Sequence, residues 1–278
     1  MPIREKAEWF QALHQQGCFV IANAWDAGSA RILARLGFSA IATTSAGLAF
    51  TLGRRDGRAS VSRSEALANA ADIVAATDLP VSADLEDGYG AAPDDCAATV
   101  RLAAAAGLCG CTIEDTTADP AAPIHGFDEA VSRVRAAAIA ARAAPHPFVL
   151  TARAENFLHG RPDLDDTLRR LAAFAEAGAD CLYAPGLPTM EAIRSVVAAV
   201  APKPVNVLSG PRDRPLPLQE LADSGVRRIS VGGLLARAAY GEVVRAARLL
   251  SSGDLPGALQ GVPSHADIEV FMEPSPRP

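Results

Sequence analysis

The chain has 278 residues, a formal net charge of -6 and a composition ordinary for a globular protein, so it can bury a large core. Its 26 Lys and Arg residues form no long basic run, which argues against nucleic acid as a partner. The sequence contains no apolar run long enough to span a membrane, and residues 1–17 do not resemble a signal peptide. We therefore expect no membrane partner and a cytoplasmic protein.

The five cysteines are an odd number, and no two of them form a Cys-x-x-Cys pair. Four of them lie at or near the start of an expected strand, where a small buried thiol is the ordinary interpretation. We therefore expect free thiols in a reducing compartment rather than disulfides.

Short apolar runs alternate along the chain with longer segments of helical spacing. The short runs predict strands at 18–24, 39–45, 79–86, 110–115, 147–154, 181–187, 204–209 and 228–232. The longer segments predict helices that include 62–76, 94–106, 128–143, 163–177 and 189–199. A glycine follows several helical segments, as in Leu36-Gly37-Phe38 and Ala177-Gly178-Ala179, and is expected to end the helix in the left-handed conformation.

Eight strand–helix units in about 250 residues predict a (β/α)8 TIM barrel with additional C-terminal helices. The alternative is a doubly wound parallel sheet, but its Gly-x-Gly-x-x-Gly turn is missing after the first strand, where Asn23-Ala24-Trp25-Asp26 stands instead. We find no linker that would divide the chain. It is therefore expected to be one domain, 1–278, with the Pro-rich segment 252–278 as a C-terminal extension.

An unusual group of acids follows the third expected strand. Asp84, Glu86 and Asp87 fall within four residues, after an apolar run and before a Gly-x-Gly turn. Asp and Glu are poor strand residues and costly to bury unpaired, so such a group usually holds a cation or a proton. Carboxylates without nearby His or Cys favour Mg2+, with Mn2+ as a substitute, over Zn2+. The alternative is a solvated turn.

In a TIM barrel the site lies at the C-terminal ends of the strands, and other polar residues stand at these ends. Side chains alternate along a strand, so Asp84 and Glu86 are expected on one side, with Glu114 beside them on the next strand. Arg153, at the end of the fifth strand, can face the same pocket and suits an anionic substrate. The alternative for Arg153 is a structural ion pair with Glu155 or Glu114.

Small residues in Ser45-Ala46-Gly47 are expected where the backbone approaches a ligand closely, and successive N–H groups in such a turn can bind a carboxylate. Trp25, Glu155 and Asn206 stand at other strand ends and are further candidate substrate contacts. Asp56 lies in a polar loop and would by itself be interpreted as solvated.

Together these segments resemble the isocitrate lyase/phosphoenolpyruvate mutase superfamily. The matching segments are 23–26, 44–48, Asp56, 84–90, 113–115 and 152–155. The resemblance implies a Mg2+-dependent enzyme that makes or breaks C–C or P–C bonds at C3 of a 2-oxo acid or phosphonate, through an enolate-like intermediate. It also implies a homo-oligomer, a dimer or a tetramer built from dimers that exchange a C-terminal helix.

The resemblance also implies roles for single residues. Asp84 is the direct metal ligand, and Glu86, Glu114 and Asp56 act mostly through water. Ser45 and the amides of Ala46 and Gly47 hold the substrate carboxylate, and Arg153 binds substrate oxygens.

Two departures from the superfamily pattern bear on the reaction. Glu86 stands where an Asp is usual, and the loop 116–127 lacks the Lys-Lys/Arg-Cys-Gly-His sequence of the C–C lyases. Without a thiol in this lid, a thiolate mechanism there is excluded, which argues against isocitrate or methylisocitrate cleavage. Thr116, Thr117 or His125 could carry proton or water chemistry, although a lone loop His is more often a surface residue.

Three functions remain open from the sequence. The first is a carbon–carbon lyase, or an enzyme like phosphoenolpyruvate mutase or phosphonopyruvate hydrolase. The second is a metal-dependent aldolase-type TIM barrel acting on oxo acids. The third is a non-catalytic relative that binds a carboxylate.

Overall fold

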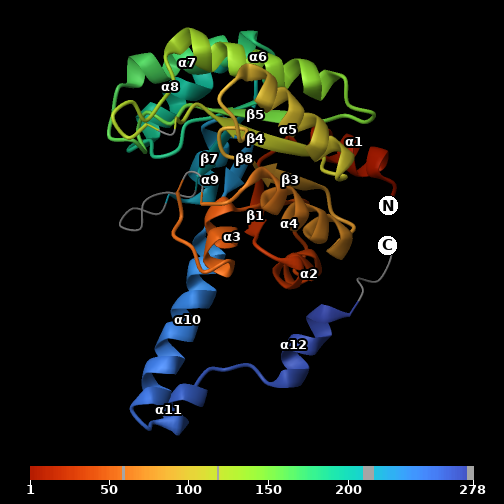
Figure 1. Ribbon diagram of the computed structural model, residues 1–278, viewed down its shortest axis with the longest axis vertical. Coiled ribbons are helices and arrows are strands. Elements are labelled where there is room, and N and C mark those ends of the chain that lie inside the picture. Colours follow the sequence, from red (N-terminus) through yellow and green to blue (C-terminus); the bar gives the residue numbers. More distant parts are fainter. Residues whose placement is uncertain (58–59, 118, 209–215, 274–278) are drawn as a thin grey trace.

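The computed structural model describes residues 1–57, 60–117, 119–208 and 216–273. Eight parallel strands follow one another in chain order around a closed barrel, in which the eighth strand pairs with the first (Figure 1). They are β1 (Phe19–Ala24), β2 (Ile41–Thr43), β3 (Val81–Asp84), β4 (Gly110–Glu114), β5 (Val149–Arg153), β6 (Cys181–Tyr183), β7 (Val205–Leu208) and β8 (Arg228–Ser230). A closed sheet confirms the TIM barrel and rules out the open doubly wound sheet.

Most helices pack around the outside of this barrel (Figure 1). They are α1 (Ile3–Leu13), α2 (Ala27–Arg35), α3 (Ser45–Thr51), α4 (Arg63–Ala76), α5 (Pro93–Ala105), α6 (Phe127–Arg142), α7 (Leu164–Glu176), α8 (Met190–Val200), α9 (Leu218–Asp223), α10 (Leu234–Ser251), α11 (Leu255–Leu259) and α12 (His265–Met272). The five helices specified from the sequence are α4 to α8, each with both ends within one residue of expectation. The strands are mostly shorter than expected, and the expected end of the seventh, Ser209, lies outside the described residues.

Local sequence signals set these helix ends. Ser62 caps α4: its hydroxyl accepts the N–H of Glu65, and the Glu65 carboxylate accepts the N–H of Ser62 in return. Gly178 follows α7 in the left-handed conformation with φ of 111°, as expected of a helix-ending glycine. A Cβ at Gly178 would lie 2.9 Å from the Cβ of Ala138, so the turn into β6 also needs a residue without a side chain.

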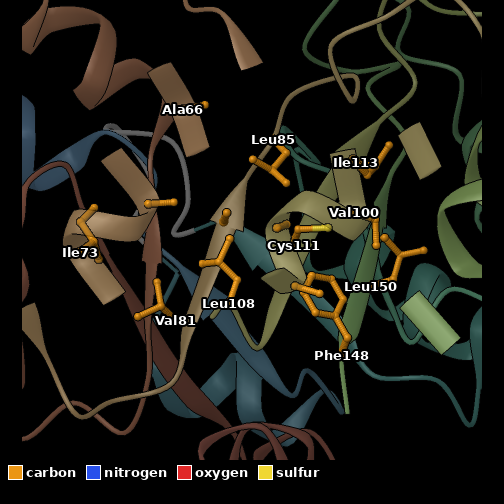
Figure 2. Packing of buried hydrophobic residues seen from close by; sticks show 14 of the residues in the cluster. Ala66, Ile73, Val81, Leu85, Val100, Leu108, Cys111, Ile113, Phe148 and Leu150 are labelled. Carbon is orange, nitrogen blue, oxygen red and sulfur yellow. The ribbon is translucent and has the colours of Figure 1, made fainter. Parts of the chain in front are cut away.

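The largest hydrophobic core lies between the first strands of the barrel and the helices outside them. Val81, Ile113 and Leu150 from the sheet meet Val100 of α5 and Leu108 in this layer (Figure 2). A second cluster fills the same position around β5 to β8. Burial of these apolar side chains is the main driving force for closing the barrel.

All five cysteines are free thiols, as expected. Four are buried and Cys18 is half-buried. Burial raises the pKa of Cys96 and of Cys109 to about 11, so these thiols stay protonated at neutral pH. Their role is packing rather than chemistry.

Helix α1 closes the N-terminal end of the barrel. The His14 ring contacts Phe10 and Phe19 edge-on, with centroids 4.8 and 5.2 Å away. Its Nδ1–H donates to the Phe10 carbonyl (2.8 Å), and its Nε2 accepts from Arg228 (3.2 Å), so the ring is neutral. Burial, and then the charge of Arg228, lowers the pKa of His14 to about 3.

The His14 environment predicts a loss of stability as the pH falls below 6.5. An unfolded chain protonates His14 near its ordinary pKa of 6.5, whereas the folded chain does so only near 3, so protons favour unfolding between these values. The slope attributable to this group approaches about 1.4 kcal/mol per pH unit. Urea unfolding between pH 7 and roughly 4.5 gives the free energy of unfolding at each pH, which should fall with this slope in the wild type but not in His14→Gln. The same pH dependence in both proteins would contradict the prediction.

The C-terminal arm, residues 234–273, leaves the barrel after β8. Helix α10 runs away from the barrel (Figure 1). Of its residues, only Ala236 is buried. Helix α12 returns to the barrel and packs against α2. The expected extension 252–278 therefore contains helices, although residues 274–278 lie outside the described residues. In the described part of the chain, no helix combines the length and apolarity needed to cross a bilayer.

Candidate functional site

A cavity of about 220 Å3 opens at the C-terminal ends of the strands, where the barrel architecture places active sites. Residues from the tips of β1 to β8 and their loops line it. The expected site residues among them are Ser45, Ala46, Asp56, Asp84, Arg153 and Asn206. The structure therefore brings together side chains that are up to 161 positions apart in the sequence (Ser45 to Asn206).

Asp84, the last residue of β3, is the polar centre of this cavity. Its Oδ2 accepts from the hydroxyl of Ser45 (2.9 Å) and from the Ser45 N–H (3.2 Å). Its Oδ1 accepts from Thr112 (3.2 Å) and from Arg153 (3.1 Å). These contacts come from the start of α3, from β4 and from the end of β5, so the barrel itself orients the carboxylate.

Arg153 stands at the tip of β5, opposite Glu114 of β4 in register. Its Nη1 lies 3.1 Å from oxygens of both Asp84 and Glu114, and its Nε donates to Glu155 at 2.8 Å. Its guanidinium also lies over the Tyr183 ring, 5.1 Å from the centroid. The structural ion pairs considered for Arg153 are thus present, and they hold it at the cavity.

Glu86 departs from the expected geometry. The third strand was expected to reach Glu86 but ends at Asp84, because Glu86 is left-handed with φ of 46°. The expected same-side alternation with Asp84 was therefore wrong. Glu86 lines a second cavity, about 800 Å3, that is also lined by Arg54, by residues 60–63 and by the lid residue His125.

The acids of the site offer carboxylate oxygens that could bind a metal ion. Burial, then the charges of Asp84 and Glu114, raises the pKa of Glu86 to about 8, and burial with the Asp84 charge raises that of Asp56. These raised pKa values reflect burial and repulsion between neighbouring carboxylates that Arg153 does not remove, and a bound Mg2+ or Mn2+ would favour their ionised forms. Among the described residues, no three His, Cys, Asp or Glu side chains lie close enough to form a full ligand set. The residues thus fit an ion that keeps several waters, as Mg2+ usually does.

Ser45, Ala46 and Gly47 form the first turn of α3 rather than an isolated turn. The Thr44 hydroxyl caps this helix and accepts the Gly47 N–H at 3.3 Å, so that amide already has a partner. A Cβ at Gly47 would lie 2.7 Å from side-chain atoms of both Thr44 and Trp25. The close approach expected at Gly47 is therefore an approach to the protein's own side chains.

The described residues of the lid, 116–117 and 119–127, are held together as a hairpin. Thr116 and Ile124 form an antiparallel bridge, and the His125 N–H donates to the Asp115 carbonyl at 2.7 Å. The Thr116 hydroxyl donates to Glu114 at 2.8 Å, so Thr116 orients that acid. His125 Nδ1 lies 3.2 Å from Glu129 and lines the larger cavity beside Glu86. Ala118 lies outside the described residues.

Arg170 is a residue of this region that the sequence did not reveal. It reaches from α7 to donate to Asp115 Oδ2 (3.0 Å) and to the His125 carbonyl (2.9 Å), and it pairs with Asp166. Asp115 in turn accepts the N–H of Glu155 at 2.9 Å. One buried guanidinium thus fixes both ends of the lid to the tip of β5. An Arg on an outer helix carries no sequence signal of such a role.

Three further expected residues have other contacts. Asn206 is buried; its Oδ1 accepts from Arg228 (2.8 Å), and its Nδ2 donates to Ser230 (3.0 Å). Trp25 is half-buried behind Gly47 and is not among the residues that line the small cavity. Asp87, the third acid of this group, accepts the N–H of Tyr89 (3.0 Å) and lies 3.8 Å from Arg133, so it supports the turn after β3 rather than the small cavity.

Comparison with known proteins agrees with this site. Residues 10–251 match the family model described as phosphoenolpyruvate phosphomutase. A Burkholderia cenocepacia J2315 protein named as a lyase/mutase has the same fold, with a TM-score of 0.92, 51% identity and coverage of 97% of this chain and 96% of that one. Oxaloacetate acetylhydrolase in complex with its product oxalate gives a TM-score of 0.86 at 25% identity, covering 98% and 94%.

An oxaloacetate decarboxylase of Paraburkholderia xenovorans is 31% identical over 208 residues, which are 72% of this chain and 67% of that one. These matches are thus named for lyase, mutase, hydrolase or decarboxylase activities, and two of them are named for oxaloacetate. The chain belongs to the isocitrate lyase/phosphoenolpyruvate mutase superfamily, as its strand-tip residues predicted.

Proposed function

We propose that this chain is a Mg2+-dependent enzyme that makes or breaks a C–C or P–C bond at C3 of a short, pyruvate-like 2-oxo acid. The observation that supports this most strongly is that Asp84 and Arg153 meet at one cavity, with Glu114 paired to the same Arg153 at 3.1 Å. Its volume of about 220 Å3 suits a small ligand rather than a large one. Relatives named for oxaloacetate chemistry support a short oxo acid.

Each residue of the site has a task in this proposal. Asp84 holds the ion directly, and Glu86, Glu114 and Asp56 act through water. When bound, Mg2+ supplies Lewis-acid stabilisation for the negative charge that develops on the substrate. Arg153, fixed at the cavity by acids on three sides, binds substrate oxygens and stabilises the same charge.

The substrate carboxylate lies against α3 in this proposal. Ser45 lies beside Asp84, to which its hydroxyl and N–H donate in the free protein, and Ala46 lines the same cavity. The Gly47 amide contributes less, because Thr44 already accepts its hydrogen.

The lid limits the choice of chemistry. It has no thiol, and its hydroxyl nearest the acids, that of Thr116, orients Glu114. His125 and Glu86 line the cavity of about 800 Å3 on the other side of that lid. A water or proton handled there is compatible with a hydrolase or a lyase.

A substrate panel tests the proposed function. Oxaloacetate, phosphonopyruvate, phosphoenolpyruvate and alkyl-substituted malates would be offered with Mg2+, and release of pyruvate, oxalate, phosphate or a second oxo acid measured. We expect turnover of at least one member, lost with excess chelator. A chain that binds oxalate with Mg2+ but turns over no member would be a carboxylate-binding relative, and aldehyde-dependent pyruvate exchange would indicate an aldolase.

We also propose that the chain is a homo-oligomer whose C-terminal arm packs on a second copy. Val243, Val244 and Leu250 of α10 are exposed, and so are Leu255 and Leu259 of α11. A row of exposed apolar side chains on a helix that leaves the barrel is typical of an interface. This arrangement also supports the expected exchange of C-terminal helices.

Val243→Asp is expected to dissociate the oligomer. Its side chain is 61% exposed in the single chain, and a carboxylate there would be buried without a partner in an apolar interface. Light scattering after gel filtration should show a dimer or tetramer for the wild type and a smaller species for the variant. Ile139→Asp is the matched control, since Ile139 is 66% exposed but lies on α6. A wild-type monomer would contradict the proposal.

The free thiols support a cytoplasmic location. All five cysteines are unpaired, including the half-buried Cys18. Unpaired cysteines are the usual state in a reducing compartment.

A further inference from the structure

The floor of the small cavity contains a buried cation. Arg228, the first residue of β8, is 2% exposed and lines the same cavity as Asp84 and Arg153. Its Nε donates to Asn206 (2.8 Å), its Nη2 to Thr151 (2.8 Å) and its Nη1 to His14 (3.2 Å). It therefore reaches from β8 across to β5 and separates the cavity from the α1 end of the barrel.

None of these partners carries a negative charge. Asn206 and Thr151 are neutral, and His14 is neutral because its Nε2 accepts from Arg228 while its Nδ1–H donates to Phe10. Within the described parts of the chain, no carboxylate lies at ion-pair distance from Arg228. Buried charges are normally paired, because removing a charge from water is costly unless an opposite charge replaces the water.

Only some of the N–H groups of the Arg228 guanidinium donate hydrogen bonds. A guanidinium has about five N–H groups, and three of them donate in the contacts above. Arg228 begins β8, whereas Arg153 ends β5 and Ser45 follows the end of β2, so Arg228 lines the same cavity from the opposite end of the barrel. Two arginines at two ends of one small cavity match a ligand with two anionic ends.

We propose that Arg228 is an anion subsite that selects substrates with a second carboxylate. This rests on the proposed function, in which Arg153 and Ser45 hold one end of the substrate. The second carboxylate pairs with Arg228, and Asn206 holds the guanidinium in place. Arg228 is then a specificity-determining residue, and a monocarboxylate of equal length leaves its charge unpaired.

The test compares two ligands of the same length in the wild-type protein with Mg2+. L-malate has a second carboxylate where L-2-hydroxybutanoate has a methyl group, and calorimetry gives the dissociation constant of each. We expect malate to bind at least about tenfold more tightly, which is the gain typical of one charge-assisted pair. Equal affinities, or no binding of malate, would overturn the subsite.

Variants of Arg228 assign the effect to this residue. Arg228→Met should raise the dissociation constant of malate at least about tenfold, while those of 2-hydroxybutanoate and oxalate change less than about threefold. Arg228→Lys should give a dissociation constant for malate between those of the wild type and Arg228→Met. Arg227→Met is the matched control, because Arg227 is the neighbouring residue and donates to the Gly17 carbonyl instead. Should Arg228→Met not fold, the comparison of malate with 2-hydroxybutanoate in the wild type and in Arg228→Lys still tests the subsite. Equal losses for malate and 2-hydroxybutanoate would overturn the subsite.

Oxalate separates this proposal from the proposed function. Oxalate is too short to reach Arg228 while it is bound at the Asp84–Arg153 end of the cavity. Its Mg2+-dependent binding therefore tests only that end. If oxalate binds with Mg2+ and malate shows no advantage, the subsite fails and the proposed function stands. If oxalate does not bind with Mg2+, the proposed function itself fails.

Discussion

Asp84→Asn is expected to abolish Mg2+-dependent oxalate binding and to lower kcat/KM at least about 10³-fold, equivalent to about 4 kcal/mol, on whichever panel substrate is turned over. Asp84 accepts hydrogen bonds from Ser45, Thr112 and Arg153 and is the proposed direct ligand of the ion. An amide keeps the shape but removes the negative charge. Calorimetry of oxalate with Mg2+ and steady-state kinetics measure the two effects.

Asp72→Asn is the matched control for this substitution. Asp72 is an exposed acid on α4, so the same loss of charge there should leave both measurements unchanged. Circular dichroism and thermal unfolding show whether each variant is folded. A folded Asp84→Asn protein that retains metal-dependent oxalate binding would contradict the assignment of Asp84.

Arg153→Met is expected to lower kcat/KM about 10²- to 10³-fold, equivalent to about 3–4 kcal/mol, the usual effect of removing one group that stabilises developing charge. Arg153 is the cation nearest the cavity acids, with Asp84, Glu114 and Glu155 all within 3.1 Å. Its removal leaves those carboxylates to repel one another, so we also expect a lower free energy of unfolding by about 3–5 kcal/mol without Mg2+.

Adding Mg2+ should restore part of that stability in Arg153→Met, because a divalent cation offsets the same negative charge. Urea unfolding with and without Mg2+ measures this recovery. Arg142→Met serves as the control: Arg142 forms an exposed pair with Asp180, worth at most about 1 kcal/mol, and lies outside the cavity. Unchanged turnover in Arg153→Met would contradict a catalytic role for Arg153.

The barrel and its helix ends could be predicted because local patterns determine them. Apolar runs of strand length, capping residues such as Ser62 and helix-ending glycines such as Gly178 act within a few residues. The C-terminal ends of parallel strands then gather at one end of the barrel. The proximity of Asp84, Glu114 and Arg153 therefore follows from the sequence alone.

Features that depend on one residue's backbone or on long side chains could not be predicted. The left-handed φ of Glu86 ends β3 two residues early, and nothing in the residue type of Glu requires it. Arg170 and Arg228 act across the fold: one reaches from α7 to the lid, and the other crosses from β8 to β5. Such contacts follow only from the packing of the whole barrel.

The reaction itself depends on the lid, where prediction from residue types is weakest. Thr116 is a sequence candidate for proton or water chemistry, and its hydroxyl in fact donates to Glu114. His125 remains a candidate at the larger cavity, beside Glu86 and Glu129. The metal and carboxylate part of the site is thus better defined by its geometry than the group that moves the proton.

Calorimetric titration of the purified protein with oxalate, in the presence of Mg2+ and again in excess chelator, tests the central claim most directly. Oxalate has the two adjacent oxygen-bearing carbons of a pyruvate enolate and should bind at the cavity formed by Asp84, Arg153 and Ser45. The account predicts binding with Mg2+ or Mn2+ and none in the chelator. Equal binding in both conditions, or binding in neither, would contradict it.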